Sequence, residues 1–452
     1  MFRPARSLAR AVRAISRRLG RSGGTTAPGR MLLRLSPGAL GRMAGELQAG
    51  SVLVSATNGK TTSSAMLAEA LERGGRQVVH NRAGSNMAWG VATALLDAGA
   101  EPGQLGIFEV DEAWLPHVAH DLEPRLLLLS NLFRDQLDRY GELELLADRW
   151  AQLVAELDGR ARFVLNADDP LVADLGRDRQ GVTYYGVEDD SQALLGMQHA
   201  ADSKHCRNCG TPYEYEAIYL GHLGRYSCPG CGRKRPPADV AAVRVELDGM
   251  TGSRVGLRTP HGELSLRLPL PGLYNVYNAV AAAATALELG VPLAGVGAAL
   301  EGFSGSFGRV ETIEVAGRRV SILLIKNPAG ANEVLRTLLL EPGRLDLWIA
   351  LNDRTADGRD ISWVWDADFE LLAGRVQRVT CSGTRAEEMA LRLKYAGIDG
   401  AISVERELEA SLDSAVAAAA DGARLYALPT YTALLDLREL LARRGLAKRW
   451  SE

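Results

Sequence analysis

The 452-residue sequence contains no apolar run that approaches the roughly 18 residues needed to cross a membrane. Its formal net charge is only −3, which gives no electrostatic reason to expect nucleic acid as the main partner. Five cysteines are too few for the disulfide framework of a secreted protein. These absences favour a cytosolic globular protein.

Lysine is also scarce, since it accounts for six of the 52 basic residues and arginine for the rest. The two side chains differ as phosphate ligands, because lysine carries a compact point charge and arginine a planar fork. Where arginine supplies nearly all the basic charge, a lysine is more often kept for its chemistry. We therefore single out Lys60 and Lys326.

A phosphate-binding loop is predicted directly after the apolar run 51–54. In such a loop, backbone N–H groups and the N-terminus of the next helix surround phosphate, the lysine reaches the β- and γ-phosphates, and the first hydroxyl binds Mg²⁺. A glycine-containing turn before an ordinary helix is the alternative, but it does not require the complete GKTT string. The sequence predicts an ATP site that contains Thr57, Asn58, Gly59, Lys60, Thr61 and Thr62.

From residue 51 onward, apolar runs alternate with helical stretches, which predicts βαβ units and a mostly parallel sheet. The expected strands are 51–55, 77–81, 106–110, 125–131 and 162–166, and the expected helices are 62–73, 87–98 and 142–157. Ligands of open parallel sheets bind at the carboxyl ends of the strands. Glu109 stands at such an end, where it is either a Mg²⁺ ligand or a carboxylate that caps a helix or faces solvent.

Two Cys-x-x-Cys pairs follow, with 18 residues between them. Their members are Cys206, Cys209, Cys228 and Cys231. Four thiolates at this spacing suit a tetrahedral Zn²⁺, and the matched pairs with tyrosines between them are typical of a zinc ribbon. A redox dithiol is the alternative. We expect the arginines around the pairs to be solvated or to face a partner.

The first residues place arginines between apolar side chains at helical spacing. This pattern favours either a basic amphipathic helix on an anionic membrane surface or a helix packed on the body with a solvated arginine face. No small-residue cleavage site follows an apolar core, so a signal peptide is not predicted.

The length predicts two to four domains, and the glycine cluster 302–309 is the best boundary. We expect an N-terminal basic helical segment at 1–50, an α/β ATP-binding domain at 51–305 with the zinc ribbon inserted at about 200–236, and a smaller α/β domain at 306–452. Two helices, 279–289 and 293–303, would close the ATP domain, and the last domain would contain strands at 320–325, 345–351, 376–382 and 425–428.

Several strings together resemble the Mur ligase family: the Ala-Thr-Asn-Gly-Lys-Thr-Thr loop, the strand end at Glu109, the polar segment 130–141 and the Tyr-Asn-x-x-Asn stretch 274–278. Members of this family phosphorylate a carboxylate with ATP, and an amine then attacks the acyl phosphate. The resemblance implies a parallel-sheet ATP-binding middle domain of the Mur ligase type.

The same resemblance implies roles for single residues. Glu109 would help to hold Mg²⁺, Asn275 and Asn278 would lie against adenine, and Arg309, in a Gly-Arg segment that enters the last domain, would contact phosphate. The sequence departs from the family at Gln136, where many members carry a metal-binding histidine, and it has no lysine between Thr61 and Ser203. A second Mg²⁺ site therefore lacks its usual ligands.

Lys326-Asn327-Pro328 stands where the amino-acid-adding members have a His-Asn-Pro or His-Asp-Pro string. With the zinc ribbon and the polar, aromatic segment 351–366, it resembles one subgroup, the ligase subunits that work with a class I glutamine amidotransferase (GatD-like) in lipid II isoglutaminyl synthase. This implies amidation of the α-carboxyl of D-glutamate in the lipid II stem peptide, with Lys326 in the ATP site.

Glutamine hydrolysis needs an activated cysteine and a histidine base. The remaining cysteine, Cys381, lies in an apolar run, and none of the seven histidines has a supporting motif. Ammonia must then come from elsewhere. If the partner that the resemblance implies brings the cysteine and the histidine, a carboxylate of this chain could orient that histidine as the third member of a triad. We choose Asp353, at the end of the 345–351 strand, over Asp357 and Asp360.

Two other functions stay open at this point. A Mur ligase that adds an amino acid directly would need its own amine pocket and no partner. A zinc-ribbon ATPase that acts on nucleic acid would need a basic face and would bind in a salt-dependent way.

Overall fold

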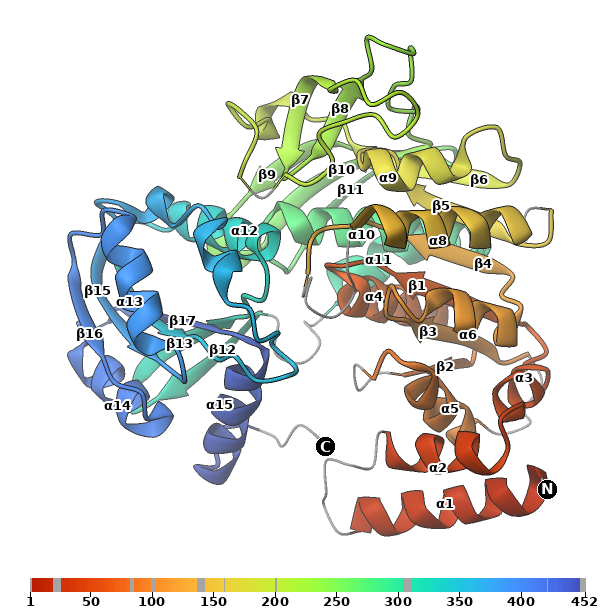
Figure 1. Cartoon of the computed structure of the whole chain (residues 1–452), viewed down its shortest axis with the longest axis horizontal. Helices are drawn as coiled ribbons and strands as arrows, with labels where there is room; N and C mark the ends of the chain where they lie inside the picture. Colours follow the sequence, from red (N-terminus) through yellow and green to blue (C-terminus); the bar gives the residue numbers. More distant parts are fainter. Residues whose placement is uncertain are drawn as a thin grey trace.

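The computed structural model describes residues 2–18, 26–81, 85–98, 103–135, 143–157, 159–199, 201–303, 310–420 and 422–447. Two α/β sheets, one of nine strands and one of six, organise this part of the chain (Figure 1). The predicted α/β class with mostly parallel sheets is confirmed.

The larger sheet has the order β11-β10-β9-β6-β5-β4-β1-β3-β2. Its strands are β1 (Ser51–Ser55), β2 (Val78–His80), β3 (Leu105–Glu109), β4 (Leu126–Leu129), β5 (Arg162–Asn166), β6 (Val182–Val187), β9 (Val240–Leu247), β10 (Ser253–Thr259) and β11 (Gly262–Leu268). All pairings from β2 to β9 are parallel, and β10 and β11 extend the sheet in an antiparallel way.

Helices cover both faces of this sheet, so the central strands are apolar on both sides. The helices are α4 (Lys60–Arg73), α5 (Ala88–Asp97), α6 (Leu115–Leu122), α8 (Leu143–Glu156), α9 (Pro170–Ala173), α10 (Leu273–Glu288) and α11 (Leu293–Glu301). In β4, Leu126 and Leu128 pack into the core under α4, α10 and α11, whereas Leu127 and Leu129 pack into the core under α5, α6 and α8.

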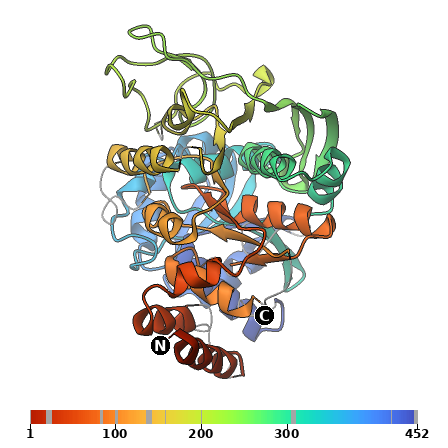
Figure 2. The same ribbon diagram turned by 90° about the vertical axis from the view of Figure 1, so that its right-hand side faces the viewer.

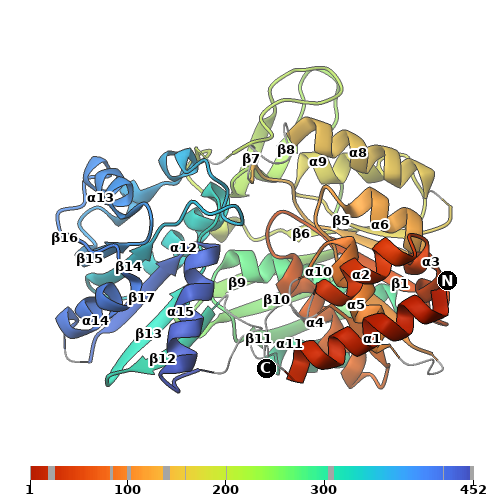
Figure 3. The same cartoon turned by 60° about the horizontal axis from the view of Figure 1, so that its bottom comes forward.

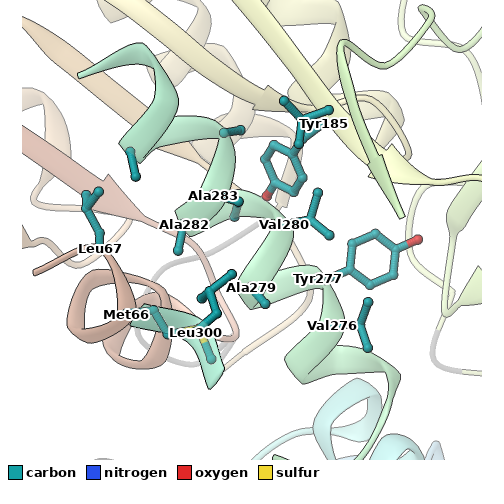
Figure 4. Packing of buried hydrophobic residues seen from close by; sticks show 14 of the residues in the cluster. Met66, Leu67, Tyr185, Val276, Tyr277, Ala279, Val280, Ala282, Ala283 and Leu300 are labelled. Atoms are coloured by element: carbon teal, nitrogen blue, oxygen red, sulfur yellow. The ribbon is translucent and has the colours of Figure 1, made fainter. Parts of the chain in front are cut away.

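Helix α10 is rich in alanine, and its small side chains let it pack closely on the sheet and on α4. Figure 4 shows Met66 and Leu67 of α4 beside the alanines of α10. The helix begins at Leu273, not at residue 279 as the sequence predicted. The Tyr-Asn-x-x-Asn stretch therefore forms the first turns of the helix. Gly272, with φ 85°, makes the preceding turn, so the helix can begin at the next residue.

The smaller sheet has the order β12-β13-β17-β14-β15-β16. Its strands are β12 (Val310–Val315), β13 (Arg318–Leu323), β14 (Leu345–Ala350), β15 (Val376–Ser382), β16 (Ala401–Val404) and β17 (Arg424–Pro429). Helices α12 (Pro328–Leu339) and α13 (Ala386–Tyr395) pack on one face, and α14 (Leu408–Ala418) and α15 (Tyr431–Arg443) pack on the other. Figure 3 shows α12 on the side of this domain that faces the larger sheet.

Three helices precede β1, and these are α1 (Phe2–Arg18), α2 (Ala27–Leu35) and α3 (Ala39–Ala44). Helix α1 packs on the body through Ala5 and Ala9, while Leu8 is 51% exposed. Arg10 and Arg13 are not wholly solvated, because their guanidinium groups donate hydrogen bonds to carbonyls in the last turns of α5. None of the helices described has the length and apolarity to span a bilayer.

A two-stranded antiparallel hairpin, β7 (Glu214–Leu220) and β8 (Leu223–Ser227), is inserted between β6 and β9. Figure 2 shows this insertion at the opposite end of the molecule from α1.

Candidate active site

The predicted phosphate loop connects β1 to α4, and its turn depends on Gly59. Gly59 has φ 90°, a backbone region that L side chains rarely adopt. A Cβ at this position would also lie 1.9 Å from Oδ1 of Asn278. Glycine therefore lets the loop enter the helix while α10 packs directly against it.

Asn131, two residues beyond the end of β4, holds the loop in place. Its Oδ1 accepts from the backbone N–H of Asn58 at 2.9 Å, and its Nδ2 donates to the Asn58 carbonyl at 3.0 Å. The Asn131 carbonyl accepts from the Thr57 N–H at 3.0 Å. The neighbouring strand thus fixes the shape of the loop.

Lys60 begins α4 and is almost fully buried. Its Nζ lies 3.0 Å from Oε2 of Glu112. Burial opposes the charge of this lysine, but three carboxylates outweigh burial and raise the pKa of Lys60 above its ordinary value; they belong to Glu112, Asp111 and Glu109. Burial also opposes the charge of Glu112, yet Lys60 and Lys326 lower the pKa of its carboxyl. Lys60 is therefore a cation beside an anionic strand end.

Glu109 is the last residue of β3 and is 2% exposed. Its register partner is Val54 of β1, which places its carboxylate at the strand end beside the loop. A carboxylate and the Thr61 hydroxyl are the hard oxygen donors that Mg²⁺ prefers. The chemistry of the donors present thus fits Mg²⁺.

A cavity opens beside the loop, between α10, α12 and the turn of the β7–β8 hairpin. The empty space within it, together with its opening to solvent, is about 760 Å³. The residues around it include Gly59, Thr62, Tyr274, Asn278, Lys326 and Gly330. Phosphate-loop, helix and C-terminal residues therefore share one cavity.

The C-terminal domain contacts the loop directly through residues at the start of α12. Lys326 Nζ donates to the Thr57 carbonyl at 3.1 Å and forms an ion pair with Asp135. The side-chain amides of Asn327 and Asn58 exchange two hydrogen bonds, of 3.1 and 3.3 Å. Both lysines singled out in the sequence are therefore brought to the same loop.

Not every predicted residue lines the cavity. Asn278 does, but Asn275 lies behind it, where its Nδ2 donates to the Pro271 carbonyl and its Oδ1 accepts from Asn278. Arg309 and Gln136 lie outside the described residues.

Asp353 stands apart from this cavity, three residues beyond the end of β14. Its Oδ1 accepts from the Thr384 hydroxyl at 2.8 Å, and its Oδ2 accepts from Arg385 Nε at 2.7 Å. The hydrogen bond from Thr384 and the charge of Arg385 hold the pKa of Asp353 below its ordinary value. Its side chain is 24% exposed. Asp353 is therefore an ionised carboxylate at the surface.

The four cysteines of the insertion come together. Their Sγ atoms all lie within 4.8 Å of one another, with Cys206 to Cys231 at 3.6 Å and Cys209 to Cys228 at 3.4 Å. A tetrahedral Zn²⁺ with Zn–S bonds of about 2.3 Å would place its thiolates about 3.8 Å apart. The donor set and its spacing thus fit Zn²⁺.

Some residues of the site were missed from the sequence. Glu112 follows the predicted strand 106–110 by two residues, so its place at a strand end was a signal for the site. Asp135 and Asn327 also stood in the strings quoted for the family, but their partners lie 191 and 269 positions away. Nothing in the sequence indicated that Leu220 and Leu223, at the hairpin turn, line the cavity.

Comparison with known proteins covers nearly the whole chain. Residues 54–228 match the Mur ligase middle domain family, and residues 324–434 match the MurT ligase C-terminal family. The chain is 32% identical, over 438 residues, to the lipid II isoglutaminyl synthase (glutamine-hydrolyzing) subunit MurT of Staphylococcus aureus (strain N315), and the match covers 96% of this chain and 97% of the relative.

A second relative is the subunit of the same name from Streptococcus pneumoniae (strain ATCC BAA-255 / R6), which is 33% identical over 437 residues, or 96% of this chain and 95% of the relative. Among solved structures, a pseudomurein peptide ligase type C from Methanothermus fervidus superposes with a TM-score of 0.68 at 23% identity, covering 88% of this chain and 79% of that one. That structure shares the fold.

Proposed function

We propose, from the premise that this chain belongs to the MurT family of Mur ligases, that it is the ATP-dependent ligase subunit of a glutamine-hydrolysing lipid II isoglutaminyl synthase. Its product would be D-isoglutamine, formed by amidation of the D-glutamate α-carboxyl in the stem peptide. The observation that carries the proposal is the convergence of Lys60 and Lys326 on one phosphate loop.

The residues of the loop suit transfer of a phosphoryl group to a carboxylate. The substrate oxygen would attack the γ-phosphorus of ATP, ADP would leave, and ammonia would then displace phosphate from the acyl phosphate. Lys60 and Lys326 would stabilise the negative charge that develops on the phosphoryl oxygens. Thr61 and Glu109 would hold Mg²⁺, which supplies charge neutralisation at the phosphates when bound.

The described part of the chain offers no thiol suited to glutamine hydrolysis. The four clustered cysteines would be occupied as the zinc ligands proposed below, and burial raises the pKa of the fifth, Cys381, to about 12. A nucleophilic cysteine needs a lowered pKa and access to substrate. The ammonia would therefore come from a partner subunit, for which we infer a class I, GatD-like amidotransferase in a heterodimer.

Three aspartates near β14 were candidates to orient the partner's histidine, and their contacts favour Asp353. Both oxygens of Asp357 accept from Thr432, at 2.7 and 2.5 Å, and Asp357 is buried. Asp360 accepts from the backbone N–H of Ser362. Asp353 is ionised, as the third member of a triad requires, and its partial exposure would let it reach a histidine of the partner.

The alternatives have less support. Direct addition of an amino acid does not explain the match to MurT subunits over 96% of the chain. Nucleic-acid binding needs unpaired basic groups, yet Arg225, Arg233 and Arg235 around the hairpin are paired with Asp190, Asp174 and Asp168. The lipid-linked substrate would bring the protein to the inner face of the cell membrane.

The proposal is tested by reconstitution with a class I amidotransferase from the same organism. We expect lipid II to be amidated, with release of ADP, when glutamine is supplied together with the partner. High ammonium should support the reaction without the partner, because it bypasses glutamine hydrolysis. Incorporation of an amino acid in place of ammonia, or amidation without ADP release, would contradict the proposal.

We also propose that the four cysteines hold one structural Zn²⁺. Metal analysis of protein purified without chelators should find about one zinc per chain, and Cys206→Ser/Cys228→Ser should lose it. Because structural zinc contributes free energy of folding, the double variant should also become sensitive to proteolysis within 200–236. Cys381→Ala, which removes a cysteine outside the cluster, is the control. An equal zinc content in the unmodified protein, the double variant and the Cys381→Ala control would refute the assignment.

A further inference from the structure

The cysteine module, here residues 201–236, reaches the nucleotide cavity through the turn of its hairpin. Leu220 ends β7 and Leu223 begins β8, and both line the cavity. They are 6% and 1% exposed. Gly59 of the phosphate loop and Tyr274 of α10 line the same cavity. The apolar part of the cavity therefore includes a wall that the inserted module provides.

The hairpin turn is fixed to the body at several points. His222, between the two leucines, is fully buried, and its Nε2 lies 3.5 Å from Oδ2 of Asp169 in the body. The N–H of Gly224, directly after the turn, donates to the Asp168 carbonyl at 2.9 Å. Arg336 of α12 donates to the Tyr219 carbonyl at 2.7 Å. The two leucines are thus held by both domains that surround the cavity.

The turn is also connected to the cysteines by packed tyrosines. Cys206 and Cys228 are buried in a small cluster with Tyr213 and Tyr226. Tyr215 packs against both tyrosines, and its hydroxyl donates to the His222 carbonyl at 2.9 Å. Loss of the cysteine cluster would therefore remove the packing that supports the turn.

A second connection runs through Asp168, which is fully buried. Arg235, just beyond the last cysteine, donates to its Oδ1 at 2.6 Å, and the hydroxyl of Tyr277 donates to its Oδ2 at 2.7 Å. Tyr277 lines the cavity from α10. The C-terminal end of the cysteine module is thereby joined, through Asp168, to a side chain that lines the nucleotide site.

We propose that the hairpin turn of the cysteine module is the base-binding wall of the nucleotide site, with Leu220 and Leu223 packed against the purine, and that zinc at the four cysteines strengthens nucleotide binding by holding this wall in place. The inference rests on the proposed ATP site. The base would lie between the turn and α10, continuous with the phosphates at the loop.

The wall is tested by comparing Mg²⁺-saturated ADP with inorganic tripolyphosphate, which has no base. By calorimetry, Leu223→Ala and Leu220→Ala should each raise the Kd of ADP about tenfold, as expected when an apolar contact in a pocket is lost, and leave tripolyphosphate binding within about twofold. Leu195→Ala is the matched control, because Leu195 precedes the module and is fully exposed. It should change neither Kd.

Lys60→Ala tests the ATP site independently of the apolar wall, because it should weaken the binding of both ADP and tripolyphosphate. If Lys60→Ala leaves both Kd values unchanged, the proposed function fails. If both leucine variants retain zinc and bind ADP normally, the wall is wrong and the ATP site stands. Equal weakening of ADP and tripolyphosphate by the leucine variants also overturns the wall, because it would indicate general damage to the loop.

The role of zinc is tested on the unmodified protein, where no variant needs to fold. Removal of zinc by a chelator should raise the Kd of ADP at least tenfold. Binding free energies are reciprocal, so ADP should raise zinc affinity by the same factor in competition with a chromogenic chelator. Zinc affinity that is independent of ADP, or zinc-free protein that binds ADP normally, would overturn this part of the proposal.

Discussion

Replacing Lys60 by alanine is expected to lower ATP-dependent amidation about a thousandfold, the effect of removing one preorganised group that stabilises transition-state charge. Lys60 is buried, charged and held beside the loop by Glu112. Steady-state rates with glutamine and with ammonium should fall together, because both reactions pass through the same acyl phosphate. Normal turnover by a folded Lys60→Ala protein would refute the phosphate-loop assignment.

A loss of stability has to be separated from this loss of chemistry. Lys60→Ala leaves the Glu112 carboxylate buried without its partner, which costs on the order of 3–5 kcal/mol of unfolding free energy. The double variant Lys60→Met/Glu112→Gln removes both charges, so it should recover much of that stability in urea unfolding. It should remain inactive, because stability without the lysine does not restore charge stabilisation.

Asp353→Asn should lower glutamine-dependent amidation by roughly 10³- to 10⁴-fold, the cost of replacing a triad aspartate by its amide. The amide keeps the size of the side chain but loses the charge that stabilises an imidazolium and selects its tautomer. Ammonium-dependent amidation should survive, since Asp353 does not line the nucleotide cavity. Amidation rates measured on the same complex, once with glutamine and once with ammonium, test whether only the glutamine-dependent rate falls.

The control for Asp353 is Asp360→Asn, in the same segment, which should retain both activities. Folding should be little affected in either variant, because the ion pair of Asp353 with Arg385 is partly exposed and solvent screens such pairs. Equal loss with glutamine and ammonium would assign Asp353 to the ligase site. No loss with either nitrogen source would show that Asp353 is a surface carboxylate without a role in the reaction.

Long apolar runs were the part of the fold that the sequence predicted best. Strands β1 and β5 begin and end where the runs do, because each is bounded by polar or turn residues and buried along nearly its whole length. Strand β10 was not predicted. Its residues alternate between buried and exposed, as the outer antiparallel part of the sheet requires, and exposed arginines interrupt its apolar pattern.

The residues of the site also differ in how well the sequence predicted them. The phosphate loop is local, so its residues could be identified from one string of sequence. The contacts between Lys326 and Thr57 and between Asn327 and Asn58 each join residues 269 positions apart. Such contacts depend on how two domains pack, which hydrophobic periodicity does not encode. The apolar cavity wall was missed for a further reason, because two leucines at a turn resemble ordinary core residues.

The smaller sheet also joins the nucleotide site rigidly to Asp353, the carboxylate proposed to orient the partner's histidine. Lys326 follows β13 and Asp353 follows β14, with β17 hydrogen-bonded to both strands. At about 4.8 Å per strand, the two strand ends lie roughly 10 Å apart, and backbone hydrogen bonds fix that spacing. A rotation that withdrew Lys326 from the loop would therefore move Asp353 with it, so the ATP-site lysine and the carboxylate proposed to face the partner would move as one rigid unit.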